Sequence, residues 1–219
     1  MPSVKIKKHA PQNDMTPFVD VSFLILSFFM LATKFKPEDP VEITTPSSVS
    51  SAAAPEKDVF TVQIDKAGKA YISLDNPEFS RKMIENVNSG RNLGLTESEM
   101  RTFVNSPSIG IPFNQLKSYL QLDPESQKKF TSPGIPVEDS TGGEMYFWVR
   151  DVLSAYQGRK LNLVIKADNS TKYPAFKNVL NAFKKNDQNK FLLITNPEDA
   201  PAGTALFETR QKQVNAKKQ

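Results

Sequence analysis

Apolar residues form one long uninterrupted run near the N-terminus and several shorter runs after residue 58. The long run is residues 17–33, PFVDVSFLILSFFMLAT, in which Asp20 is the only ionisable residue. An α-helix over this run has a length of about 25 Å, near the lower limit for crossing a bilayer core. Met15 and Phe35 extend its apolar length at the two ends. We therefore predict one membrane-spanning helix over residues 15–35.

A cleaved secretory signal has a similar outline, with positive charge followed by an apolar stretch. Three features oppose it: an acidic residue within the run, the length of the run, and the sequence Lys-Phe-Lys at 34–36 in place of a small-x-small cleavage site. Three lysines and no acidic residue precede Asp14, which favours a cytoplasmic N-terminus, although the lysines at 34 and 36 weaken the contrast. We expect a cytoplasmic tail at 1–14 and an extracytoplasmic remainder.

After the apolar run, the chain changes from a linker composition to a folded pattern near Asp58. Residues 36–57 are rich in Pro, Ser, Ala and charge, with one short extended patch at 41–45. Beyond them, alternation and turn residues predict strands at 59–65, 70–74, 160–167 and 191–195 and a helix at 173–185. The prediction is an α+β domain over 58–197, with a small sheet packed by helices on one face. A polar tail follows at 198–219.

Residues 76–140 carry a weaker, mainly helical pattern. Pro and Gly divide it into short helices at 79–87, 96–104 and 114–122, and Thr-Glu-Ser-Glu at 96–99 has the form of a capping box. A firmer amphipathic helix is predicted at 145–156. Its apolar face includes Trp148, which we interpret as a core residue in preference to a ligand platform.

Composition excludes several function classes. The net charge is +4, but the basic residues are interleaved with 24 acidic ones and form no stripe, which argues against nucleic-acid binding. Cysteine is absent and the only histidine is His9, so neither a thiolate metal site nor a histidine-centred catalytic site is available to the large domain. Neither GxGxxG nor GxxxxGK occurs. We expect no enzyme activity, no metal and no bound cofactor.

Asp20 needs an explanation because the bilayer disfavours charge. Insertion scales assign Asp about 2.5 to 3.5 kcal/mol at the centre of a membrane helix. One interpretation places Asp20 among the lipid headgroups, since it lies only three positions into the run. In the other, helical spacing aligns Thr16, Asp20 and Ser27 as one polar stripe, which faces a partner helix or a wet path.

The second interpretation suits proton transfer. An apolar environment favours a neutral carboxyl group and a wet one favours its carboxylate, so a helix that moves between the two takes up and releases a proton. One charge crossing 100 mV releases about 2.3 kcal/mol, which is comparable to the cost of placing a carboxylate in the membrane. One helix cannot form a channel, so a proton path requires oligomers or a multi-span partner.

The residues around Asp20 carry a family likeness. Residues 13–21, Asn-Asp-Met-Thr-Pro-Phe-Val-Asp-Val, followed by the apolar run, closely resemble the ExbD/TolR family of inner-membrane proteins in Gram-negative bacteria. Residues 41–46, Val-Glu-Ile-Thr-Thr-Pro, are similar to the family's extended segment after the helix. Residues 161–195 resemble its strand, Ala-Asp turn, helix around a Tyr, and last strand. The insertion at about 76–140 is a departure, because typical members lack it.

The resemblance implies a proton-motive-force-driven motor subunit. Asp20 matches the family's proton-carrying aspartate, and Thr16 and Pro17 match its flanking pair. An ExbD-like role implies a dimer of these helices inside a pentameric, multi-span ExbB-like channel, with protons as the coupling ion. The complex then energises a TonB-like protein and hence outer-membrane import. The expected location is the inner membrane, single-pass, with the large domain in the periplasm.

The resemblance also implies a role for the segment after the helix. Val41, Ile43 and Pro46 are expected to lie in a strand that pairs with the sheet, and an open sheet edge is expected to receive a TonB segment by strand addition. Two alternatives stay open. One is a TolR-like envelope-maintenance subunit, or a gliding or secretion motor. The other is a membrane-tethered periplasmic binding module in which Asp20 is only interfacial and conducts no protons.

Overall fold

The chain divides into two compact units, residues 1–38 and residues 39–219. The computed structural model describes residues 15–32, 41–49, 55–137, 143–198 and 204. The predicted cytoplasmic tail and nearly all of the predicted C-terminal tail lie outside the described residues.

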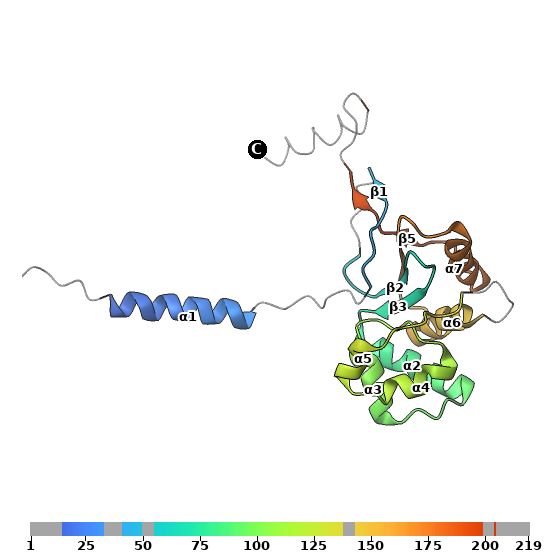
Figure 1. Cartoon of the computed structure of the whole chain (residues 1–219), viewed down its shortest axis with the longest axis horizontal. Coiled ribbons are helices and arrows are strands. Elements are labelled where there is room, and N and C mark those ends of the chain that lie inside the picture. The colour runs from blue at the N-terminus through green and yellow to red at the C-terminus, as the bar shows by residue number, and fades with distance from the viewer. Residues whose placement is uncertain (1–14, 33–40, 50–54, 138–142, 199–203, 205–219) are drawn as a thin grey trace, which may run out of the picture. The chain divides into compact units, whose positions relative to one another are not determined.

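Helix α1, Thr16–Ala32, is the only described element of the first unit, and it is drawn in blue in Figure 1. The carbonyl oxygen of Met15 accepts hydrogen bonds of 3.1 Å from the N–H groups of Phe18 and Val19, which starts the helix. Pro17 fits the first turn because its missing N–H has no partner to lose there. All of the large apolar side chains of α1 are more than half exposed.

The structure describes a helix from Thr16 to Ala32 within the range predicted to span the membrane, 15–35, and residues 33–35 lie outside the described part of the chain. None of the helices that the structure describes is both long enough and apolar enough to cross a membrane.

The second unit contains a four-stranded sheet of order β3-β2-β4-β5. Strands β2 (Val59–Ile64) and β3 (Ala70–Leu74) form an antiparallel hairpin, and β4 (Asn162–Ala167) and β5 (Leu192–Leu193) run parallel to β2. The hairpin turn requires a left-handed residue, which Gly68 supplies at φ +82°. The α+β class expected from the sequence agrees with this mixed sheet and its helices.

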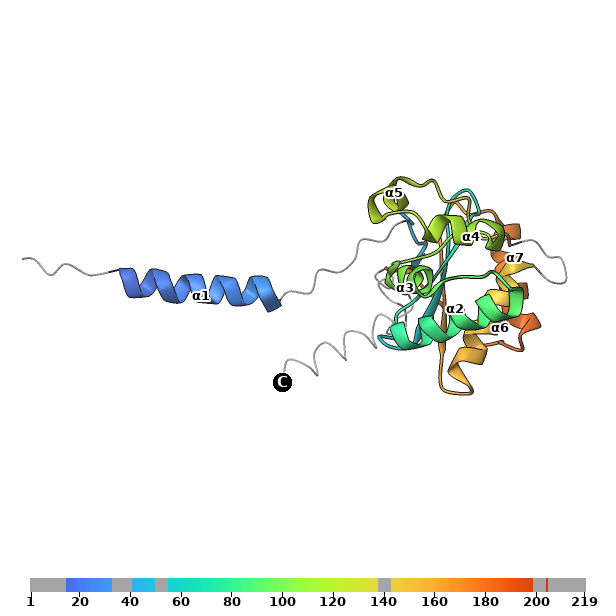
Figure 2. The same cartoon turned by 90° about the horizontal axis from the view of Figure 1, so that it is seen from below.

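Six helices accompany the sheet in the described part of the second unit. They are α2 (Pro77–Arg91), α3 (Glu97–Asn105), α4 (Phe113–Leu120), α5 (Pro124–Lys129), α6 (Glu144–Tyr156) and α7 (Tyr173–Lys185). Helices α2, α3, α4 and α6 lie below the sheet in Figure 1 and in front of it in Figure 2. Alternate residues of β2 (Phe60, Val62 and Ile64) point to this side and have no exposed surface. Full burial of such a side chain contributes about 1.5 to 3 kcal/mol.

Trp148 is a core residue, as predicted from the sequence. Its side chain has no exposed surface. The ring of Phe103 is stacked on it at 5.8 Å between centroids, and that of Phe113 lies at 4.9 Å. The indole Nε1 is buried without a hydrogen-bond partner, so the side chain stabilises the core by packing alone.

A partly buried cation joins α2, the first helix of the segment 76–140, to α6. The guanidinium of Arg91 lies 4.3 Å from the ring centroid of Phe113 and 4.1 Å from that of Phe147. It also forms an ion pair of 3.2 Å with Asp151, whose side chain is 4% exposed. Burial lowers the pKa of Arg91, and the carboxylate of Asp151 opposes this effect. The contacts make α2 part of the domain core and not an appendage to it.

The same region covers one edge of the sheet. Ile72 of β3 exchanges two backbone hydrogen bonds of 2.8 Å with Ile109, and the N–H of Ile135 donates to the carbonyl of Ala70 at 2.8 Å. The outer edge of β3 is therefore occupied by residues from within the segment 76–140.

Most predicted helices are confirmed with shifts of a few residues. The capping box is present, with the N–H of Thr96 donating to Glu99 Oε2 at 2.7 Å and the N–H of Glu99 donating to Thr96 Oγ1 at 3.4 Å. Helix α5 was not predicted as a separate element. The strand predicted over 191–195 is wrong in extent, because only Leu192–Leu193 pairs with the main sheet.

Candidate functional site

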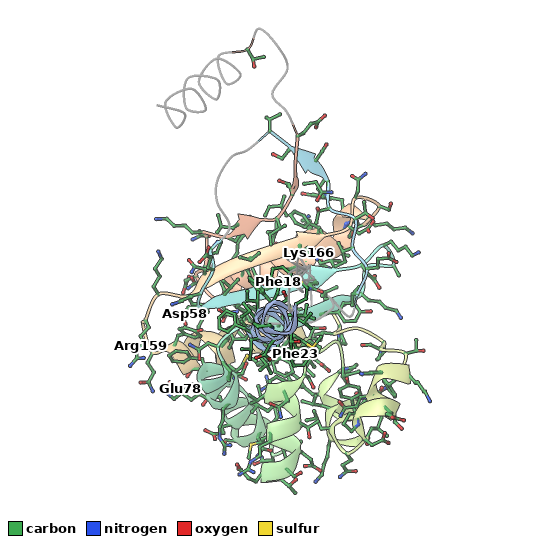
Figure 3. The ribbon with its side chains drawn as sticks, turned by 90° about the vertical axis from the view of Figure 1, so that its left-hand side faces the viewer. Phe18, Phe23, Asp58, Glu78, Arg159 and Lys166 are labelled. Carbon is green, nitrogen blue, oxygen red and sulfur yellow. The ribbon has the colours of Figure 1, made fainter. Side chains whose placement is uncertain are left out.

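Helix α1 places the predicted polar side chains along one face. Thr16, Asp20 and Ser27 are four and seven positions apart in a continuous helix, a spacing that keeps them on one side. Ser27 is the only residue of α1 that is partly buried. Figure 3 looks nearly along α1 and labels Phe18 and Phe23 among its side chains.

Asp20 is exposed, and its carboxylate makes no hydrogen bond or ion pair with any residue that the structure describes. A second polar residue, Ser22, lies off the stripe, and its hydroxyl donates to the carbonyl of Phe18 at 2.8 Å. This back-bond satisfies the Ser22 hydroxyl within the helix. Asp20 is thus the ionisable group of α1 that remains available to a partner.

The second candidate region is the segment 41–49, which we call the tether segment because it follows α1 in the chain. Its strand β1 (Ser47–Ser48) pairs in parallel with β6 (Asn196–Pro197). The carbonyl of Pro46 accepts from the first N–H of β6 at 2.8 Å, and the last carbonyl of β1 accepts from the N–H of Glu198 at 2.9 Å. The tether segment is therefore fixed to the C-terminal end of the folded domain.

Side chains strengthen this junction. Thr45 Oγ1 donates to the side-chain oxygen of Asn196 at 2.8 Å, and the amide nitrogen of the same asparagine donates to the Thr45 carbonyl at 3.0 Å. Thr45 is only 7% exposed. Asn196 thus binds both the side chain and the backbone of one tether residue.

Asp168 holds the tether segment at a second point. Its Oδ1 accepts from the N–H of Ser170 at 2.8 Å, and its Oδ2 accepts from the N–H of Thr44 at 3.0 Å. These donors hold the pKa of Asp168 below its usual range. The carboxylate connects the turn after β4 to a residue 124 positions earlier.

The turn at Asp168 also explains why the last strand is divided. Strand β4 ends there, and the tether segment continues in its place, with the N–H of Asn169 donating to the carbonyl of Thr44 at 2.8 Å. The residues of the last predicted strand therefore pair with two different partners. Leu192–Leu193 pairs with β4 and forms β5, and Asn196–Pro197 pairs with the tether segment and forms β6.

The tether strand begins later than the sequence indicated. Of the residues expected to pair, Pro46 contributes its carbonyl, whereas Val41 and Ile43 make no ladder hydrogen bond among the described residues. Two causes account for this. Pro46 has no N–H, and the N–H of Thr44 is bound by the Asp168 carboxylate, so a regular ladder starts only at β1. The partner is also β6 and not the main sheet.

Acid is expected to release the Thr44 contact. Because the folded-state pKa of Asp168 is lowered, its stabilising contribution is complete above its ordinary value of about 3.9 and is lost as the pH falls through the lowered value. NMR of the full chain should show the Thr44 amide resonance moving in this acid range. Asp168→Asn should abolish the movement while the spectrum of β2 is retained. A Thr44 resonance that titrates equally in that variant would contradict the assignment.

One edge of the main sheet is open in the described part of the chain. Strand β5 pairs with β4 on one side, and no described residue pairs with its other side. Leu192 and Leu193 are 41% and 44% exposed. An exposed edge of this kind offers unpaired N–H and C=O groups to an added strand.

Sequence reasoning missed Asp168 and Asn196. An Asp-Asn-Ser sequence after a strand does signal an Asx turn, which accounts for the bond from Ser170 to Oδ1. It gives no sign that the second carboxylate oxygen is bound by Thr44. Among residues 15–32, 41–49, 55–137 and 143–198, no cluster of acidic or histidine side chains is arranged to hold a metal ion.

Comparison with known proteins gives one family. A family model described as ExbD, biopolymer transport protein ExbD/TolR, matches residues 7–198. The match runs through α1, the tether segment and the folded domain as far as Glu198. No curated protein and no solved structure matches the chain.

Proposed function

Because the chain belongs to the ExbD/TolR family of biopolymer transport proteins, we propose that it is an ExbD-like motor subunit that uses the proton motive force to energise TonB-dependent outer-membrane transport. The observation that carries the proposal is the continuity of the family match through α1, where Asp20 lies beside Thr16 and Pro17 of the family signature.

The first step is membrane anchoring by α1. A helix that is apolar apart from one narrow polar face normally lies within a larger protein or a membrane, and every large apolar side chain of α1 is more than half exposed. We propose that residues 15–35 form the span in the inner membrane, with residues 1–14 in the cytoplasm and the α+β domain in the periplasm. The three lysines of the N-terminal tail support this orientation.

The second step is proton transfer through Asp20. Its carboxylate has no partner among the described residues, and we propose that another subunit supplies its surroundings. We propose that two copies of α1 lie inside a pentamer of ExbB-like subunits. A wet path ionises Asp20 and an apolar wall favours its protonated form, so that each protonation changes which wall the helix prefers. The helix pair then rotates or slides.

The third step is coupling to the partner in the periplasm. Strand addition to the open edge of β5 is the mode that the sheet offers, because the edge of β3 is already occupied by Ile109 and Ile135. The proposed occupant is an extended segment of a TonB-like protein.

Co-purification tests the proposal. We expect affinity-tagged full-length chain, extracted in mild detergent from its own bacterium, to retain a multi-span ExbB-like subunit and a TonB-like protein. Recovery of a Tol-type set instead would assign the TolR-like role, and recovery of neither would refute motor function.

A variant of the open edge of β5 distinguishes the proposed contact with the TonB-like protein from the proposed contact with the channel subunit. Replacing both Leu192 and Leu193 with lysine places charge on the edge and disfavours strand addition. The channel subunit should still be recovered because it contacts α1, whereas the TonB-like protein should be lost. Leu180→Lys is unsuitable as a control because this residue packs against the core. Lys184→Glu, at an exposed position of α7, is the matched control.

A further inference from the structure

A cavity of about 530 Å³ lies between β3 and the helices of the segment 76–140. Its wall is formed by one end of the hairpin, the C-terminal part of α3, the loop that follows α3, and residues around α5. Val41 of the tether segment also lines the cavity, and the volume remains with this residue in place. Binding sites for small molecules have volumes of about 300 to 1,000 Å³. The cavity is therefore large enough for a small ligand, and the tether segment borders it without filling it.

The apolar part of the wall is largely aromatic. Tyr71, Tyr119 and Phe130 line the cavity, and the rings of Tyr119 and Phe130 meet edge to face with their centroids 5.4 Å apart. Gly110 gives the Tyr71 ring its place, because a Cβ atom at this position would overlap that ring. Aromatic rings of this kind offer a large apolar surface for a flat group of a ligand.

The charged part of the wall is positive. Lys69 and Lys128 line the cavity, and none of the described residues that line it is acidic. The ammonium of Lys69 donates to the carbonyl of Ser132, another wall residue, at 3.0 Å, which leaves two of its three N–H groups for a ligand. Lys128 forms no ion pair with any other described residue. The two ammonium groups can therefore both donate to an anion, in hydrogen bonds that charge strengthens.

Two neutral side chains of the wall add further donors. The hydroxyl of Tyr119 and the amide of Asn105 make no hydrogen bond with any residue that the structure describes. Burial raises the pKa of Tyr119, so its hydroxyl keeps its proton at neutral pH and remains a donor.

Two carboxylates near the wall already have donors of their own. Asp65 accepts from the hydroxyl of Tyr71 at 3.3 Å and from the N–H of Lys69 at 2.9 Å. Asp123 precedes the wall residue Pro124 and caps α5, where its Oδ2 accepts from the N–H of Ser126 at 3.0 Å. These bonds offset part of the negative charge that would otherwise oppose an anion in the cavity.

We propose that the cavity is a binding site for a small organic anion, which places a carboxylate or phosphate group at Lys69 and Lys128 and a flat apolar ring against Tyr71, Tyr119 and Phe130. The segment 76–140 then gives the chain a ligand site of its own. The site uses no residue of α1 or β5, so this inference goes beyond the motor proposal and can hold whether or not the chain couples to protons.

NMR of the tyrosine rings tests the proposal. The chain has five tyrosines, of which Tyr71 and Tyr119 line the cavity, whereas Tyr146, Tyr156 and Tyr173 do not. The probes are naphthalene-2-carboxylate, 2-naphthyl phosphate and the neutral naphthalene-2-carboxamide, each titrated into the full-length chain with ¹³C-labelled tyrosine rings in detergent.

We expect at least one of the two anions to shift the signals of the two cavity tyrosines and to leave those of the other three unchanged. It should bind about tenfold more tightly than the carboxamide, because only an anion pairs with both lysines. Tighter binding of the carboxylate or of the phosphate identifies the anionic group of the natural ligand. Equal binding of the carboxamide, or no shift of either cavity tyrosine with either anion, would overturn the proposal.

Two lysines of α5 provide a matched pair of variants. Lys128→Met removes a charge from the wall, whereas Lys129→Met removes one from an exposed neighbour that does not line the cavity. The first should weaken binding of the tighter anion about threefold to fivefold and the second should leave it unchanged. Equal losses in both variants would mean general attraction to a basic surface and would also overturn the proposal.

A variant that fills the cavity gives the last arm. Asn105→Trp, at an exposed wall position at the end of α3, should abolish the shift of Tyr119 in a chain that retains its circular dichroism. If this variant does not fold, the two lysine variants decide, because both change exposed side chains. Unchanged binding in folded Asn105→Trp would place the anion outside the cavity.

Discussion

Replacing Asp20 with asparagine is expected to abolish proton-dependent uptake in cells while the chain still folds and inserts. An amide has nearly the shape of a carboxyl group but cannot take up or release a proton at physiological pH. The motor therefore loses the step that couples proton flow to movement. The measurement is energy-dependent uptake in cells in which the variant is the sole copy. It is accompanied by the amount of protein in the membrane fraction.

Two variants control this result. Asp187→Asn makes the same chemical change at an exposed residue of the folded domain with φ +58°, a conformation that asparagine tolerates. It should leave uptake unchanged. Asp20→Glu retains a titratable carboxyl group and should preserve part of the activity. Normal uptake by Asp20→Asn would leave Asp20 as an interfacial residue and favour the tethered binding module.

Truncating Trp148 to alanine is expected to reduce the free energy of unfolding of the folded domain by about 3 to 5 kcal/mol, because it leaves a large cavity in a core with little room to collapse. The ring contacts Phe103 and Phe113 and has no exposed surface. Since Trp148 is the only tryptophan, denaturant unfolding must be followed by far-UV circular dichroism and not by intrinsic fluorescence.

The matched variant Trp148→Phe separates packing from hydrogen bonding. Nε1 of Trp148 has no partner, so phenylalanine removes an unsatisfied donor while it keeps an aromatic ring between its neighbours. The loss should be clearly smaller than for alanine. An equal loss in both variants would mean that the indole nitrogen is satisfied in solution.

The sequence predicted the elements whose signals are local. The hairpin, the capping box at Thr96 and the helix around Trp148 each depend on residues close together in the chain, and each is present. Asp20 was found because an acidic residue within an apolar run is unusual wherever the helix lies. Its proposed role in proton transfer stays a prediction.

Contacts between distant residues could not be predicted in this way. The bond from Thr44 to Asp168 and the pairing of β1 with β6 depend on how the domain closes, and neither residue pair has a shared local pattern. The prolines on either side of residues 41–45 did indicate that regular strand pairing of the tether segment would begin only after them, because proline has no N–H to donate. The cavity at Val41 had no sequence signal, since its wall comes from several separate segments.

The two edges of the main sheet have unequal consequences for assembly. Since Ile109 and Ile135 occupy the edge of β3, growth of the sheet within the described part of the chain is possible only beside β5. Within the described residues, the main sheet of each copy therefore offers one edge for strand addition. If two copies join through this edge, neither retains it for another protein, and if a foreign strand binds there, the pair must be held elsewhere, for instance by α1. Pairing between two copies and binding of a foreign strand then compete for the same edge of β5. The ratio of the two complexes in the cell depends on the concentration of the partner protein.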